Sequence, residues 1–410
     1  MSEELSIVKA VGKDQMIISW DLGRRCNYDC TYCPAHRHDN VSPHAELTEL
    51  SKTAGFVYEY LELLMEFRKH KQVSISFTGG EPTVNPNFIN FCKWLREEYN
   101  EKYKDLYRLN LSLTSNGATS KKVCDAIIEN LNFITISYHC EGTDRLKEMV
   151  KENILYFNEK KFPMKINVMF HGRKDYFKEC IELCKDLRKN NIEFVPRMIG
   201  EYEDNNKYHH KYDQSQMNWM KNYWKTNEIT DLESAEGSIA IKSKENKNTE
   251  VCGEKKTTEV SDDKKNARSL GRPCCGKREM SVCNKDKTKW TNTTFLSFAK
   301  FEKWYCSVNW FFLHIEQQTK LIYHHQTCQA DFGGKRGSIG STDNTKPILD
   351  NLRKNLSERK MPIIVCPNKI CGCGLCTPKA KNFDDFMKTL PGHVDVGVFD
   401  KNITQEHIVT

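Results

Sequence analysis

The chain of 410 residues lacks any long apolar segment. No apolar run approaches the ~18 residues that a helix needs to cross a bilayer, so we expect no membrane span. The first residues, Met1-Ser2-Glu3-Glu4, contain neither the basic stretch nor the apolar core of a secretory signal, which predicts a cytoplasmic location. Eighteen cysteines in such a reducing compartment favour metal ligands over disulfides.

Aromatic side chains are missing from residues 226–289. The first part of this stretch is rich in Lys, Glu, Asn, Ser and Thr, so it buries little apolar surface and is expected to be an exposed insert or linker. The net charge of +7 is modest and leaves a nucleic-acid partner open. The length fits two domains. We therefore expect a core over 1–225, the insert over 226–270, a cysteine-rich domain over 271–380 and a tail over 381–410.

The first half of the chain alternates between short apolar runs and segments with helical spacing. This alternation predicts right-handed βαβ units and a parallel sheet, and the continuously apolar runs predict strands covered on both faces. In such sheets, ligands bind at the carboxyl ends of the strands. The six predicted strands are 16–20, 73–77, 109–113, 133–137, 166–170 and 192–195.

Three cysteines follow the first of these strands in the run CNYDCTYC, namely Cys26, Cys30 and Cys33. Four thiolates would close a cluster site, whereas three leave one coordination position open for chemistry. A zinc knuckle, or three thiols that are close by chance, is the alternative.

Polar and glycine-rich segments follow the next strands. Gly79-Gly80-Glu81-Pro82 comes after the second strand, where glycines let backbone approach a ligand and Glu81 offers an acceptor for a cation. The segment 114–117, which contains Ser115 and Asn116, follows the third strand. Plain turns are the alternative for both segments.

Together these motifs resemble the radical S-adenosylmethionine (SAM) superfamily. The resemblance implies a partial (β/α)6 barrel of α/β class, with a doubly wound open sheet as the structural alternative. It also implies a [4Fe–4S] cluster on Cys26, Cys30 and Cys33, whose fourth iron binds SAM. Further implied SAM-binding residues are Tyr32, Gly79, Gly80, Glu81, Pro82, Ser115, Asn116 and Ser137.

His139 and Cys140 end the fourth predicted strand, where substrate-facing groups are expected. Either side chain can donate or accept a proton, and we predict both as candidate catalytic residues. A buried structural role is an equally strong interpretation of each.

A second set of nine cysteines begins after residue 270. Its pattern resembles, in part, the SPASM and twitch extensions of radical SAM enzymes, which implies an auxiliary Fe–S cluster in an α+β domain. A structural zinc site is the alternative. Cys274, Cys275 and Cys283 have no assigned role. The candidate ligands of the auxiliary cluster are Cys306, Cys328, Cys366, Cys371, Cys373 and Cys376.

The resemblance implies an enzyme that cleaves SAM reductively and abstracts hydrogen from a substrate. A peptide or protein is the first expected substrate, and a nucleoside, nucleic acid or sugar is the second. A low-potential electron donor such as flavodoxin or ferredoxin is implied as a partner. The alternative from another class is a non-catalytic Fe–S or zinc protein that binds a partner.

Overall fold

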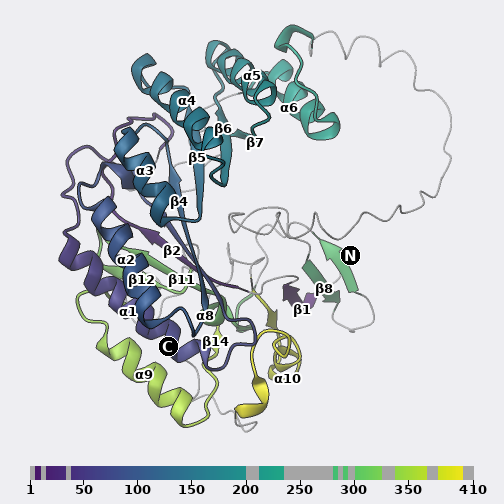
Figure 1. The fold of residues 1–410 in the computed structure, drawn as a ribbon. Helices are drawn as coiled ribbons and strands as arrows, with labels where there is room; N and C mark the ends of the chain where they lie inside the picture. Colours follow the sequence, from purple (N-terminus) through teal and green to yellow (C-terminus); the bar gives the residue numbers. More distant parts are fainter. Residues whose placement is uncertain are drawn as a thin grey trace, which may run out of the picture.

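The computed structural model describes residues 5–10, 15–33, 38–199, 212–234, 280–284, 290–293, 301–325, 338–366 and 377–399 (Figure 1). Its largest element is a nine-stranded sheet. Six strands from the first half of the chain lie in sequence order within it, and each pairs in parallel with the next. They are β2 (Gln15–Asp21), β3 (Gln72–Thr78), β4 (Arg108–Ser115), β5 (Phe133–His139), β6 (Met164–Phe170) and β7 (Phe194–Met198).

Helices connect these strands and follow one side of the sheet (Figure 1). A doubly wound sheet reverses its strand order at a switch point, whereas the order β2 to β7 runs in one direction as in a barrel. The predicted partial (β/α)6 arrangement is therefore confirmed. The helices are α1 (Leu47–Met65), α2 (Phe88–Lys102), α3 (Lys121–Asn130), α4 (Asp144–Glu159), α5 (Lys174–Lys189) and α6 (Gln214–Thr226).

The two faces of this sheet differ, which corrects the prediction that both are covered apolar faces. On the helix side, Trp20 is fully buried with its ring 5.3 Å from that of Phe91. The opposite face carries polar residues that are only partly buried, because alternate residues of a strand point to opposite faces. Examples are Ser19, Ser76, Thr114, Ser137 and Arg197. We call this polar side the concave face.

The second half of the chain extends the same sheet. The segment 308–316 begins with the helical turn α8 (Val308–Phe311) and continues as β11 (Phe312–Glu316). β11 pairs in parallel with β2, and β12 (Leu321–Tyr323) and β13 (Ser338–Ser341) follow in antiparallel order. Helix α9 (Lys346–Ser357) contacts α1 and lies below it at the lower left of Figure 1.

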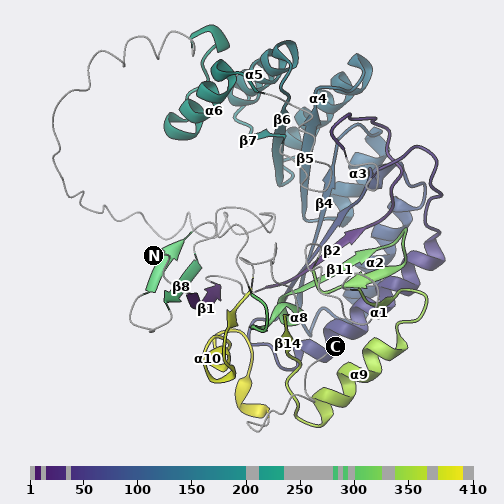
Figure 2. The same cartoon turned by 180° about the vertical axis from the view of Figure 1, so that it is seen from behind.

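A smaller six-stranded sheet lies beside the barrel (Figure 2). It joins the N-terminal strand β1 to strands from the second half, and α10 (Phe383–Met387) packs against it. The strand pairings therefore cross the predicted boundary between 1–225 and 271–380, and the proposed domain division stays a prediction. The strands are β1 (Leu5–Ala10), β8 (Met280–Asn284), β9 (Trp290–Thr293), β10 (Tyr305–Cys306), β14 (Ile364–Val365) and β15 (Lys379–Ala380).

Within the described part of the chain, no helix combines the length and the apolar character needed to cross a bilayer. Only residues 226–234 of the predicted insert fall inside the described ranges.

Candidate functional site

The loop after β2 and the turn after β3 lie side by side at the carboxyl ends of the strands. Their backbones continue the pairing of the two strands, because Gly80 N donates to Gly23 O at 2.8 Å and Glu81 N donates to Arg25 O at 2.8 Å. Cys26 is the next residue of the first loop. The turn 79–82 therefore lies directly against the start of the cysteine loop, as the sequence motifs require if they share one ligand.

The two glycines of this turn allow close contact with the backbone of residues 23–25. A Cβ at Gly80 would approach Arg24 O to 2.2 Å, and a Cβ at Gly79 would approach Gly23 O to 2.4 Å. Gly79 also has φ of +131°, a conformation that L side chains rarely adopt. The close approach predicted for a ligand is thus made by the backbone of the cysteine loop.

Glu81 is buried, and its carboxylate joins the turn after β3 to the end of β4. It accepts hydrogen bonds from Thr83 N at 3.0 Å, Thr83 Oγ1 at 2.7 Å, Ser115 Oγ at 2.9 Å and Asn116 N at 2.6 Å. Three of these donors bond to Oε1 and one bonds to Oε2, so Oε2 keeps acceptor capacity. Burial raises the pKa of Glu81, and the hydrogen bonds oppose that rise. The predicted role of Glu81 as acceptor for a cation stays a prediction, and its observed partners make it a positioning residue.

Asn116 connects this network to the cysteine loop. Its Nδ2 donates to Asn27 Oδ1 at 2.6 Å and lies 3.9 Å from Cys26 Sγ. Asn27 Nδ2 in turn donates to Ala118 O at 2.9 Å. Gly117, with φ of +80°, forms the turn after Asn116. The structure thus brings the predicted segments 79–82 and 114–117 together around the cysteine loop.

The three cysteines lie in one short loop. Cys30 is buried, Cys26 and Cys33 are half-buried, and Cys33 N donates to Cys30 O at 3.0 Å. Burial raises the pKa of Cys26 to about 11 and that of Cys30 to about 12, and the charges of the neighbouring thiolates add to both shifts. Three thiols close enough to influence one another fit a cationic cluster, because a bound metal is what keeps such thiols deprotonated.

Aromatic residues of this loop pack against the end of β5. The Tyr32 hydroxyl is hydrogen-bonded to His139 Nδ1, and the Tyr28 ring covers Gly142. Burial lowers the pKa of His139 to about 4, so the imidazole is neutral at pH 7. Tyr32 and His139 are thus brought together, and their predicted roles in SAM binding and catalysis stay predictions.

A second contact fixes the same loop to β5 and β6. Glu141 accepts from Thr31 N at 2.8 Å and from Thr31 Oγ1 at 2.7 Å, and its Oε1 lies 3.1 Å from His171 Nε2. Asn27, Glu141 and His171 of this network were not among the residues predicted from the sequence. Their only signal is position, since Asn27 lies inside the cysteine motif and the other two follow strand ends.

The other residues predicted for the end of β5 lie on opposite sides of the sheet. Ser137 is half-exposed on the concave face, level with Asn167 of β6. Cys140 is fully buried, and its proximity to Cys180 of α5 adds to the rise that burial causes in the pKa of the Cys180 thiol. This position favours the structural interpretation of Cys140.

Two of the six candidate auxiliary ligands fall within the described residues. Cys306 of β10 and Cys366, which follows β14, are buried on adjoining segments, and Cys366 N donates to Trp304 O at 2.9 Å. Lys379 Nζ donates to Cys306 Sγ at 3.4 Å. Cys328, Cys371, Cys373, Cys376, Cys274 and Cys275 lie outside the described residues, whereas Cys283 lies in β8.

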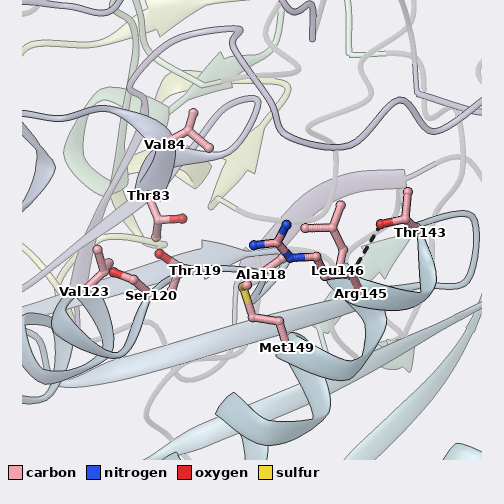
Figure 3. Close-up of a pocket in the computed structure, with 10 residues that line it drawn as sticks. All are labelled: Thr83, Val84, Ala118, Thr119, Ser120, Val123, Thr143, Arg145, Leu146 and Met149. Carbon is pink, nitrogen blue, oxygen red and sulfur yellow. Dashed lines mark hydrogen bonds between the residues drawn. The ribbon is translucent and has the colours of Figure 1, made fainter.

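A groove of about 520 Å³ lies beside the site, between the loop before α3 and the start of α4 (Figure 3). Its lining includes the side chains of Thr119, Thr143 and Arg145, and none of the predicted site residues. The groove adjoins the cysteine loop through Ala118, whose carbonyl accepts from Asn27.

Comparisons with known proteins identify the barrel. Residues 20–211 match the family model of the radical SAM superfamily. The chain is 27% identical over 190 residues to GTP 3',8-cyclase of Desulforamulus reducens, which covers 43% of this chain and 54% of that protein. It is 22% identical over 161 residues to the probable GTP 3',8-cyclase of Thermococcus kodakarensis, covering 36% and 45%. The chain thus spans about half the length of these curated relatives.

Solved structures give weaker similarities. Native anSMEcpe with bound AdoMet has a TM-score of 0.39 at 17% identity, covering 52% of this chain and 63% of that chain. HydG, a maturase of the [FeFe]-hydrogenase, has a TM-score of 0.33 at 14% identity, covering 50% and 48%.

The family match covers the cysteine loop, the turn after β3 and the strands β3 to β7. The superfamily implies a [4Fe–4S] cluster and SAM, and the donor set of the cysteine loop fits that cluster. Residues 20–211 of this chain are therefore a radical SAM superfamily domain.

Proposed function

We propose that the protein reductively cleaves SAM at a [4Fe–4S] cluster on Cys26, Cys30 and Cys33. The observation that carries this proposal is the set of hydrogen bonds that holds the cysteine loop against residues 79–81 and Asn116. Such contacts fix the orientation of metal ligands, and their partners tune the metal. A non-catalytic Fe–S or zinc protein would not need this arrangement.

The bound cluster and SAM would supply the radical chemistry, and the protein would supply position and shielding. Cys26, Cys30 and Cys33 would hold the cluster, and residues 79–82 with Asn116 would orient it. With one electron from an external low-potential donor, such as flavodoxin or ferredoxin, the loaded cluster would supply cleavage of a carbon–sulfur bond of SAM to methionine and a 5′-deoxyadenosyl group able to take a hydrogen atom from the substrate.

The substrate would lie on the concave face, where Ser19, Ser76, Thr114 and Ser137 offer hydrogen-bonding groups. A peptide or protein, the first expectation from the sequence, has polar groups that suit such a face. We also propose an auxiliary Fe–S cluster whose ligands include Cys306 and Cys366.

A nucleotide is the second candidate substrate. Arg197 lies half-buried on the concave face and donates to Asn167 Oδ1 at 3.1 Å, so its guanidinium is oriented there. Arginine in such a position suits a phosphate. The names of the two curated relatives favour the same class.

The test is anaerobic reconstitution with iron and sulfide, followed by reductant and SAM. We expect 5′-deoxyadenosine from the wild-type protein and a fall to background in Cys30→Ala. The matched control is Cys92→Ala, because Cys92 is equally buried but lies on α2. No 5′-deoxyadenosine from the wild-type protein, or equal amounts from Cys30→Ala, would contradict the proposal.

The substrate is tested separately. Incubation with GTP and with a peptide library, in deuterated and ordinary form, shows which class transfers deuterium to 5′-deoxyadenosine. Arg197→Ala should reduce deuterium transfer from a nucleotide more than from a peptide. An equal reduction for both substrates would argue against the nucleotide.

A further inference from the structure

A second group of metal-ligating side chains lies where β2 and β11 end. Asp21 is the last residue of β2, and Glu316 is the last residue of β11. The register pairs Glu316 with Asp21 and His314 with Ser19, so these side chains point to the same face of the sheet. Ligand atoms of Asp21, His314 and Glu316 all lie within 4.8 Å of one another.

His314 distinguishes this group from an ordinary polar cluster. Its side chain is only 2% exposed, and neither ring nitrogen has a hydrogen-bond partner in the described part of the chain. A buried polar group without a partner costs about 1–3 kcal/mol, so a ligand for the imidazole would remove a real penalty. The nearest acidic atom, Glu316 Oε1, lies 3.6 Å from His314 Nε2, which is beyond hydrogen-bond distance.

The spacing suits a metal ion between the two side chains. Metal–ligand bonds of 2.0–2.2 Å place the ligand atoms of a tetrahedral ion about 3.3–3.5 Å apart. The 3.6 Å between His314 Nε2 and Glu316 Oε1 nearly meets that value. A hydrogen bond also orients the Glu316 carboxylate. Thr319 Oγ1 donates to Glu316 Oε2 at 2.9 Å, and Oε1 is the oxygen that lies nearer to His314. Supporting hydrogen bonds of this kind are typical of metal-binding carboxylates.

We propose that Asp21, His314 and Glu316 bind a divalent transition-metal ion, separate from the cysteine cluster. One imidazole and two carboxylates suit Zn²⁺, Mn²⁺ or Fe²⁺, and three protein ligands leave a position for water or for an oxygen of a molecule on the concave face. Because Asp21 immediately precedes the loop to Cys26, such a molecule would lie near the start of the cysteine loop. Metal binding at this group does not depend on the proposed SAM cleavage.

The test uses Mn²⁺ with the full-length chain in equilibrium dialysis, because Mn²⁺ prefers oxygen and imidazole ligands over the thiolates of the cysteine sites. We expect one Mn²⁺ per wild-type chain and displacement of that ion by Zn²⁺. His314→Leu and Glu316→Gln should each weaken Mn²⁺ binding by at least ~100-fold. His324→Gln should bind as the wild type does, since His324 is also buried in the same hairpin region but is not in the group.

Two results would overturn the proposal. One is a wild-type chain that takes up no stoichiometric Mn²⁺, and the other is undiminished binding in both His314→Leu and Glu316→Gln. Thermal unfolding of each variant without metal separates loss of a ligand from loss of the fold. If one variant does not fold, the other decides the question. The Mn²⁺ readout is independent of 5′-deoxyadenosine formation, so failure of one proposal leaves the other standing.

Discussion

Two polar regions meet at the end of β2, and they differ in how their buried groups are satisfied. In the cysteine region, Glu81 and Asn116 have partners within the protein, and each hydrogen bond ties one loop to another. In the β2–β11 region, the imidazole of His314 is equally buried and has no hydrogen-bond partner among the described residues. The first arrangement holds two loops in place, whereas the second contains the ligand groups of the proposed metal site. Buried polar groups of native proteins are nearly always hydrogen-bonded, so the exception requires a physical explanation.

The largest effect on stability is expected at Glu81. Glu81→Ala leaves the buried N–H groups of Thr83 and Asn116 without acceptors, which should lower the free energy of unfolding by about 3 kcal/mol. Urea unfolding of the metal-free chain measures this change. The control is Glu148→Ala, because Glu148 is exposed and its pair with Lys151 contributes less than about 1 kcal/mol. Equal effects of the two variants would show that the Glu81 network does not stabilise the loops.

The next largest effect is a loss of stability at acid pH that is caused by His324, the residue after β12. Burial lowers the pKa of His324 to about 4. The unfolded chain, with a pKa of about 6.5, binds the proton first, so the stabilising contribution is complete above pH 6.5 and is lost as the pH falls toward 4. The expected loss is about 2–3 kcal/mol. Urea unfolding from pH 7 to 4 should show a flatter profile for His324→Gln, and an unchanged profile would contradict the neutral buried state.

A smaller effect is expected from Asn27, which connects the cysteine loop to residues 116–118. Asn27→Ala removes the hydrogen bonds to Asn116 and Ala118 without removing a cysteine. Loss of such supporting contacts typically costs about 10-fold or more in metal affinity. Iron retained after dialysis against a chelator gives the measurement. Asn130→Ala is the matched control, because Asn130 ends α3 and its side chain donates to Ala126 O, away from the loop. If Asn27→Ala retains as much iron as the wild type, the hydrogen bonds of Asn27 do not contribute to holding the cysteine loop.

The smallest change in stability is expected for His314→Leu, which differs most from Glu81→Ala. In the absence of metal, His314→Leu should change the free energy of unfolding by no more than about 1 kcal/mol and in the stabilising direction, because an unpartnered buried imidazole is replaced by an apolar side chain. Added Zn²⁺ should stabilise the wild type and not this variant. Strong destabilisation by His314→Leu in chelator would show that the imidazole already has a partner in the protein.

Much of the barrel was predictable from local patterns. The six apolar runs correspond to β2 through β7, because short apolar segments between amphipathic helices leave few alternatives to a parallel sheet. The alternation within each strand was harder to see. Residues such as Ser19 and Ser76 interrupt the apolar runs, and the sequence did not reveal that they share one partly open face.

The motifs predicted which segments meet, but the partners of individual residues were partly different. Gly79 and Gly80 approach the backbone of residues 23–24, and Glu81 accepts from Thr83, Ser115 and Asn116. The auxiliary cluster stays a prediction, because four of its six candidate ligands lie outside the described residues. The cytoplasmic location and the peptide substrate also stay predictions, because the fold alone specifies neither.

The sequence by itself determined the alternation of strands and helices and the three cysteines that follow the first strand, because spacing and periodicity are local properties of the chain. Only the tertiary structure placed β11 beside β2 and so brought His314 and Glu316 to Asp21. That contact joins segments from opposite halves of the chain. It depends on how the second half packs onto the edge of the sheet, which no local pattern encodes.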